Sequence, residues 1–96
     1  MPAYWIGHAR MRDPDGYRRY AELARPAFGA HEHKVLARGG SIDVLEGGTS
    51  CDRFVVVEFP SRQAALDCYW SDAYQRAAAV RQQASEECHL VIVDGV

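Results

Sequence analysis

The sequence predicts an α+β protein with the ferredoxin-like order β-α-β-β-α-β and a four-stranded antiparallel sheet. Short apolar runs rich in aromatic and β-branched residues alternate along the chain with segments of helical periodicity. Turn and cap residues separate these runs and set their order. A chain of 96 residues has the length of one small domain. We therefore treat residues 1–96 as a single domain.

The first strand is predicted at Ala3–Met11, where the sequence reads AYWIGHARM. A helix should follow, because Asp13 is a good N-cap and Pro14 suits the first helical position. Pro26 removes one helical hydrogen bond, so we expect a kink or a break there. The apolar stripe of this helix recurs at steps of three and four residues, at Tyr17, Tyr20, Ala24, Phe28 and His31.

A β-hairpin is expected in the middle of the chain. Its first strand is predicted at Lys34–Glu46, with a bend or bulge at Gly39-Gly40. The segment GGTSCD at 47–52 is typical of a loop. The second strand of the hairpin is predicted at Arg53–Phe59 and ends at Pro60.

The remainder of the chain predicts helix and then strand. Ser61 is the expected cap of a second helix, and Ser71-Asp72 offers another cap, so a break is expected near Trp70. The helical pattern resumes through Tyr74, Ala77, Val80 and Arg81. The last strand is predicted at His89–Val93.

The apolar patterns of the third and last strands predict a homodimer. Right-handed crossovers place both helical regions on one face of the sheet. A sheet with one wet face alternates apolar and polar residues, but FVVVEF at 54–59 and LVIV at 90–93 do not alternate. Both faces therefore carry apolar side chains. We expect a second copy of the chain to cover the open sheet face.

Composition excludes several classes of partner. The net charge is −2, and the basic residues are scattered from Arg10 to Arg81, which argues against nucleic-acid binding. No apolar run approaches the roughly 20 residues of a membrane helix. The three cysteines show no C-x-x-C spacing and no leader precedes the first strand, so we expect a reduced, cytoplasmic protein.

Several short motifs together resemble the family called domain of unknown function 1330, within the dimeric α+β barrel superfamily. These motifs are DP at 13–14 with Tyr17 and Tyr20, RGG at 38–40, VLEG at 44–47, EFPS at 58–61, SDAYQ at 71–75, Arg81, and VDGV at 93–96. The resemblance covers almost the whole chain. It implies a homodimer whose two sheets form a barrel, with a cavity between sheet and helices. It implies no assigned activity.

Glu58 and His8 are the candidate catalytic residues. Glu58 interrupts an apolar strand, and a half-buried carboxylate there can act as an acid or base. The structural alternative is a carboxylate paired with an arginine or lying near the start of the following helix, and we favour it. His8 lies near the end of the first strand on the same face as Tyr4 and Ile6. It can line a cavity or lie exposed at the sheet rim.

The expected function is binding of a small aromatic or anionic metabolite in a cavity between sheet and helices. Arginine guanidinium groups hold carboxylates and phosphates in a forked geometry, and tyrosines offer aromatic faces with a polar end. Internal ion pairs are the alternative use of these arginines. The candidate ligand-binding residues are Tyr17, Arg38, Arg53, Tyr69 and Arg81.

The alternative function is that of a cofactor-independent enzyme of monooxygenase or isomerase type. In that case Glu58 or His8 would abstract a proton and an arginine would stabilise the oxyanion. No cofactor is expected, since the chain carries no glycine-rich phosphate loop. No metal site is expected either. His31 and His33 stand two residues apart, which does not align them on a helix, and no zinc-binding pattern accompanies them.

Overall fold

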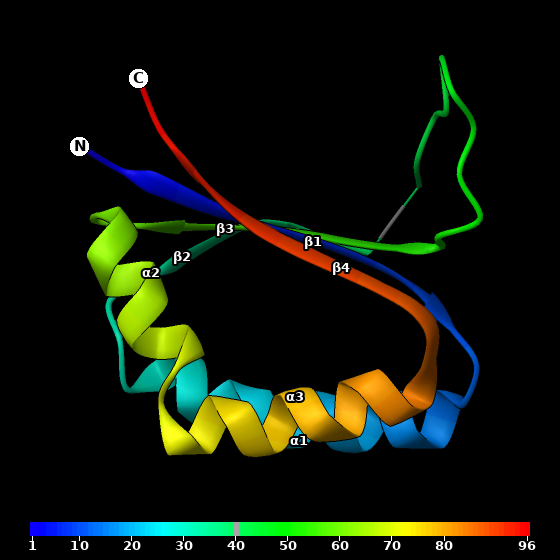
Figure 1. Ribbon diagram of the computed structural model, residues 1–96, viewed down its shortest axis with the longest axis horizontal. Coiled ribbons are helices and arrows are strands. Elements are labelled where there is room, and N and C mark those ends of the chain that lie inside the picture. Colours follow the sequence, from blue (N-terminus) through cyan, green and yellow to red (C-terminus); the bar gives the residue numbers. More distant parts are fainter. Residues whose placement is uncertain (40) are drawn as a thin grey trace.

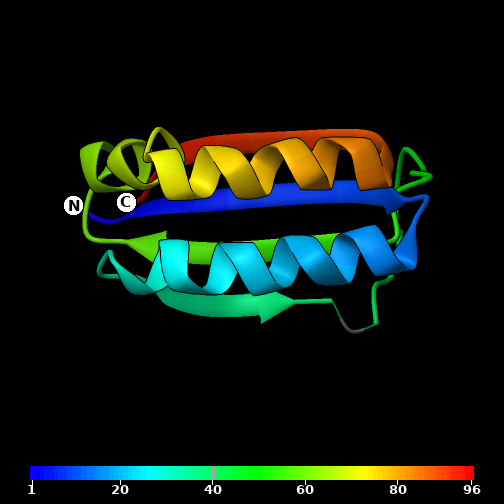
Figure 2. The ribbon, with the colours of Figure 1, turned by 90° about the horizontal axis from the view of Figure 1, so that it is seen from below.

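The chain folds into a four-stranded antiparallel sheet with three helices, in the ferredoxin-like order that the sequence predicts (Figure 1). A computed structural model describes residues 1–39 and 41–96. The sheet order is β2-β3-β1-β4, and α1 and α3 lie side by side beneath one face (Figure 2). The elements are β1 Ala3–Met11, α1 Pro14–Gly29, β2 Lys34–Arg38, β3 Arg53–Phe59, α2 Arg62–Tyr69, α3 Asp72–Ala84 and β4 Ser85–Asp94.

The core lies between the sheet and the helices and is built around Trp5. Its ring makes edge contacts with Phe28 on α1 and Tyr74 on α3, at centroid distances of 5.1 and 4.9 Å. It also stacks on Phe59 of β3 at 5.8 Å. Around these rings the helices present small side chains, which allow them to approach the sheet closely. These are Ala24 and Ala27 on α1 and Ala77 and Ala78 on α3.

The predicted helix starts are confirmed. The Asp13 side chain accepts a hydrogen bond from the Asp15 amide at 3.2 Å, and Pro14 opens α1. Ser61 caps α2 by accepting from the Ala64 amide at 3.1 Å. Ser71 caps α3 in the same way and separates it from α2, as the sequence predicts.

The predicted break at Pro26 is wrong, because α1 continues through it to Gly29. Pro26 lies in the last turn of the helix on its exposed side, where the Glu22 carbonyl that loses its helical partner is open to solvent. Its own carbonyl accepts from the Ala30 amide and closes the helix. His31 therefore falls outside the helix to which its spacing assigned it.

The second strand is shorter and the last strand longer than predicted. β2 ends at Arg38, because Gly39 turns the chain at a φ of 65°; Gly40, the other half of the expected bend, lies outside the described residues. Residues 41–52 form neither helix nor strand and rise from the sheet on the side opposite the helices (Figure 1). β4 begins at Ser85, four residues before the predicted His89, because it follows α3 directly.

The two sheet faces differ in what covers them. Side chains of β1 alternate, so that Trp5 and Gly7 face the helices while Ile6 and His8 face the open side. Val91 and Val93 of β4 also lie on the open face and are 54% and 48% exposed. Both faces therefore carry apolar side chains. Among the described residues, no helix has the length and apolar character needed to cross a membrane.

Candidate functional site: a pocket lined by arginine and tyrosine

A cavity of about 530 Å³ lies between the sheet and the helices, at the end where α1 begins. Its floor is made by Gly7 and Ala9 of β1 and Val55 of β3. Trp5 precedes Gly7 on the same face of β1, and its large ring fills the space between sheet and helices as part of the core. Gly7 and Ala9 have little or no side chain to fill that space, so the core ends and the pocket begins there.

The walls of this pocket are cationic. Arg18, Arg38, Arg53 and Arg81 line it, and none of the described lining residues is an aspartate or glutamate. Arg18 pairs with Asp15 at 3.3 Å on the surface. The other three arginines make no ion pair within residues 1–39 and 41–96. Their charge remains available to an anion.

Tyrosine rings hold two of these guanidinium groups in place. The Arg53 guanidinium lies 5.6 Å from the centre of the Tyr17 ring, and that of Arg81 lies 5.6 Å from the Tyr20 ring. Arg81 also donates a hydrogen bond to the Tyr74 hydroxyl, which lies 3.0 Å from the Tyr20 hydroxyl. A guanidinium held in this way loses little further freedom when it binds a ligand.

Burial, and after it the neighbouring Tyr20 phenol, raises the pKa of Tyr17 to about 12. The Tyr17 hydroxyl is therefore a neutral donor at physiological pH. The Arg53 guanidinium lies over its ring, and both residues line the pocket. The pocket wall therefore carries a phenol donor and a positive charge close together.

Four of the five candidate ligand residues from the sequence line this pocket: Tyr17, Arg38, Arg53 and Arg81. Tyr69 does not. It lies at the end of α2 and packs against Trp5 at 5.9 Å and Trp70 at 4.8 Å. Tyr20 also lines the pocket; the sequence placed it in the apolar stripe and in the family motif but not among the ligand candidates.

The structure does not bring Glu58 into this pocket. Glu58 lies on the open face of β3, opposite Tyr4 on β1 and Lys34 on β2. Partial desolvation and, after it, the negative charge of Glu58 raise the pKa of Tyr4. Among the described residues Glu58 has no arginine partner, and Ser61 rather than Glu58 caps α2.

His8 borders the pocket through its strand, but its ring lies on the other side of the sheet. There it stacks on Phe54 at 5.3 Å and on His89 at 4.6 Å. His31 and His33 lie in the turn after α1, where His33 Nδ1 is 2.9 Å from the His31 carbonyl oxygen. The His33 ring packs on Phe28 at a centroid distance of 5.5 Å.

Solved structures from bacteria share this fold. A protein of unknown function from Rhodopseudomonas palustris is 23% identical, with 99% of this chain and 82% of that one covered and a TM-score of 0.78. A dimeric ferredoxin-like protein of unknown function from Thermobifida fusca is 16% identical, with coverage of 99% and 92% and a TM-score of 0.69. SnoaB, a cofactor-independent oxygenase from Streptomyces nogalater, is 9% identical, with coverage of 99% and 93% and a TM-score of 0.66.

A sequence comparison with curated proteins found no match. The comparison with protein families did find one. Residues 2–96 match the family described as domain of unknown function (DUF1330). The match spans nearly the whole chain, and the chain belongs to this family.

Proposed function

We propose that this DUF1330 protein binds a small aromatic metabolite carrying a carboxylate or similar anionic group, in the pocket between its sheet and helices. The observation that carries the proposal is a cavity lined by three arginines without an ion-pair partner and by no described acidic residue. A volume of about 530 Å³ suits a small ligand. The arginines that line the walls favour a negatively charged ligand.

The arrangement of the pocket suggests how such a ligand is held. Its aromatic part fits the apolar floor of Gly7, Ala9 and Val55. Its anionic group is placed against Arg53 and the Tyr17 hydroxyl, with Arg81 behind the Tyr20 ring. Hydrogen bonds between an arginine and an anion contribute roughly 1.5–3 kcal/mol each, which gives useful affinity to a small molecule.

We propose that the protein binds this metabolite and does not catalyse a reaction on it. An enzyme of the cofactor-independent type would require a general base in the pocket beside an arginine. The two candidates, Glu58 and His8, point from the opposite face of the sheet. The similarity to SnoaB concerns the fold and supplies no base.

The working form that we propose is a cytoplasmic homodimer joined through the open sheet face. Apolar side chains remain exposed on this face, and Ile42, Val44 and Leu45 are exposed in the segment that rises beside it (Figure 1). A second copy would cover both surfaces at once. Free Cys51, Cys68 and Cys88 accord with a reducing compartment.

The test is a binding titration with matched aromatic probes. Benzoate and phenylacetate carry the anionic group, whereas benzamide has a similar size and shape without the charge. We expect the acids to bind and Arg53→Gln to weaken them by about 10-fold or more, from the loss of one charge-assisted bond. Isothermal titration calorimetry measures the affinities.

Arg76→Gln is the control. Arg76 is exposed on α3 and lies outside the pocket, so the variant has the same net charge as Arg53→Gln. The Arg76→Gln variant should bind benzoate with the same affinity as the unaltered protein. Equal binding of benzoate and benzamide, or equal loss in both variants, would argue against an anion site.

A further inference from the structure

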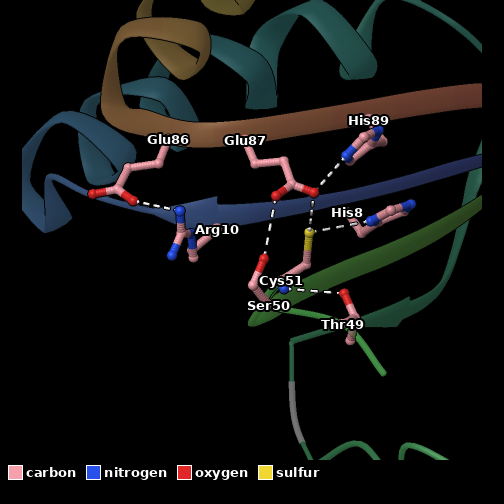
Figure 3. Close-up of polar contacts among 8 residues, drawn as sticks. All are labelled: His8, Arg10, Thr49, Ser50, Cys51, Glu86, Glu87 and His89. Atoms are coloured by element: carbon pink, nitrogen blue, oxygen red, sulfur yellow. Dashed lines mark hydrogen bonds and ion pairs between the residues drawn. The ribbon is translucent and has the colours of Figure 1, made fainter. Parts of the chain in front are cut away.

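A second polar cluster lies on the open face of the sheet, across from the pocket. It contains His8 of β1, Cys51 of the segment before β3, and Glu87 and His89 of β4 (Figure 3). One ring nitrogen of each histidine and the Cys51 sulfur all lie within 4.8 Å of one another. The Glu87 carboxylate is 2.8 Å from His89 Nε2 and 3.9 Å from Cys51 Sγ.

The fold itself holds these groups together. His8 and His89 are direct partners in the β1–β4 register. Cys51 is placed by its neighbours in sequence, because the Asp52 amide donates to the Ala9 carbonyl at 3.0 Å and the Cys51 amide to Thr49 Oγ1 at 3.1 Å. Three segments far apart in sequence therefore meet at one point.

We propose that this cluster binds a divalent transition-metal ion of the zinc type, with Cys51, His8 and His89 as three ligands and Glu87 as the fourth. Thiolate, imidazole and carboxylate are the donors that zinc uses in proteins, and four protein ligands are typical of a structural site. Bonds of about 2.0–2.3 Å in a tetrahedron place ligand atoms roughly 3.3–3.8 Å apart. The donor atoms of His8, Cys51 and His89 already lie within 4.8 Å of one another, and Glu87 lies beside two of them. We expect side-chain rotations to bring the four groups to that spacing when an ion binds.

The surroundings favour a metal ion over a reactive thiol. Cys51 is only 4% exposed, so a substrate has little access to its sulfur. Ser50 Oγ donates to the second Glu87 oxygen at 3.2 Å, an outer contact of the kind that orients a metal-binding carboxylate. Arg10, which Figure 3 also shows, pairs with Glu86 at 2.7 Å rather than with Glu87.

The ion would tie the segment before β3 to β1 and β4. Residues 41–50 are exposed throughout, and their end at Cys51 is the point that the ion would fix. Metal binding at a site that the unfolded chain lacks adds directly to folding stability. The donor side chains lie on the other side of the sheet from the arginines, although the strand segments at His8 and His89 also border the pocket. The two proposals are therefore tested with separate probes, a metal ion here and an aromatic acid above.

The test uses the purified, chelator-treated protein with cobalt and zinc as probes. Cobalt should bind at one ion per chain and show a thiolate-to-cobalt charge-transfer absorption. Cys51→Ser should abolish that absorption. Competition against a chromophoric chelator should show zinc binding weakened by about 10- to 100-fold or more in Cys51→Ser and His89→Gln.

Two control variants test whether the loss of binding is specific to the residues of the cluster. Cys88→Ser and His31→Gln change the same residue types outside the cluster and should bind zinc as the unaltered protein does. The His89 side chain is 48% exposed, so its substitution leaves the fold intact and gives a second reading if Cys51→Ser is unstable. Absence of the absorption in the unaltered protein, or its survival in Cys51→Ser, overturns the proposal.

Discussion

Side-chain size along one face of β1 decides where the core ends and the pocket begins. Trp5 is 1% exposed and is surrounded by aromatic rings, whereas Gly7 and Ala9 leave space above the sheet. A Cβ added at Gly7 would lie 3.2 Å from the nearest Val55 methyl carbon, so this floor is close-packed within the sheet itself. The empty volume therefore lies above the floor, toward the helices.

Tyr74 is the residue that joins the core to the pocket, and Tyr74→Phe should destabilise the protein. Its ring is fully buried, and its hydroxyl contacts both the Arg81 guanidinium and the Tyr20 hydroxyl. Removing the Tyr74 oxygen takes one hydrogen-bond partner from the half-buried Arg81 guanidinium and one from the Tyr20 hydroxyl. We expect the free energy of unfolding to fall by about 1–3 kcal/mol in urea denaturation.

Tyr69→Phe is the control for this effect. Tyr69 contributes its ring to the same aromatic cluster, but its hydroxyl has no hydrogen-bond partner among the described side chains. Its removal should change stability by less than about 0.5 kcal/mol. Equal losses in the two variants would mean that the Tyr74 hydroxyl contributes nothing specific.

Alkaline pH should also destabilise the fold through Tyr17. The pKa of Tyr17 is raised from 10.0 to about 12, so between these values the unfolded chain loses the phenol proton while the folded chain keeps it. The stability that the neutral Tyr17 phenol contributes is complete below pH 10 and is lost as the pH rises toward 12. Unfolding midpoints measured across this range should fall less steeply in Tyr17→Phe. A parallel decline in both proteins would contradict the assigned shift.

At the scale of elements, Gly16 lets α1 pack closely against the end of α3. A Cβ there would lie 3.0 Å from the Ala84 Cβ and 2.8 Å from an oxygen of Asp13, the residue that caps α1. Gly16→Ala should therefore destabilise the protein by about 1–3 kcal/mol, although alanine is the better helix former. Thermal and urea denaturation measure the loss.

Gly29→Ala tests the same replacement without the contact. Gly29 ends α1, its added Cβ would meet nothing within 4 Å, and its φ is not positive. Stability should stay the same or rise by up to about 1 kcal/mol. If Gly29→Ala lowers stability as much as Gly16→Ala does, the loss comes from replacing glycine in the helix backbone and not from the contact between α1 and α3.

The elements that local chemistry determines were predictable from sequence. Asp13, Ser61 and Ser71 each accept a hydrogen bond from an amide of the helix that follows, an interaction contained within a few residues. The end of β2 was not predictable. Residues 41–46 have strand-like composition, but the turn at Gly39 takes them away from β3, which depends on geometry beyond the segment.

The candidate site was predictable only in part. Arginine and tyrosine chemistry identified Arg38, Arg53 and Tyr17 as ligand candidates, and the topology then placed them around one cavity. Glu58 stood out in the sequence because it interrupts an apolar strand. Strand register puts it on the open face, and a shift of one residue would have reversed that assignment.

The whole molecule leaves one sheet face uncovered, and this determines the behaviour that we expect in solution. Val91 and Val93 are about half exposed on β4, and Ile42, Val44 and Leu45 are exposed on the segment that rises beside that face. Figure 1 shows both chain termini on this side of the sheet as well, opposite the helices. The two apolar surfaces belong to different parts of one chain, and a second copy can bury both.

Val91→Glu should therefore convert a dimer into a monomer. The substitution places one unpaired carboxylate per copy within the proposed interface, where its desolvation costs several kcal/mol. We expect the dimer dissociation constant to rise by about 100-fold or more in sedimentation equilibrium. Ala79→Glu adds the same charge at an exposed position of α3, on the helical side, and should remain dimeric. Dissociation in both variants would indicate a general charge effect, and a monomeric unaltered protein would leave the open face without its proposed partner.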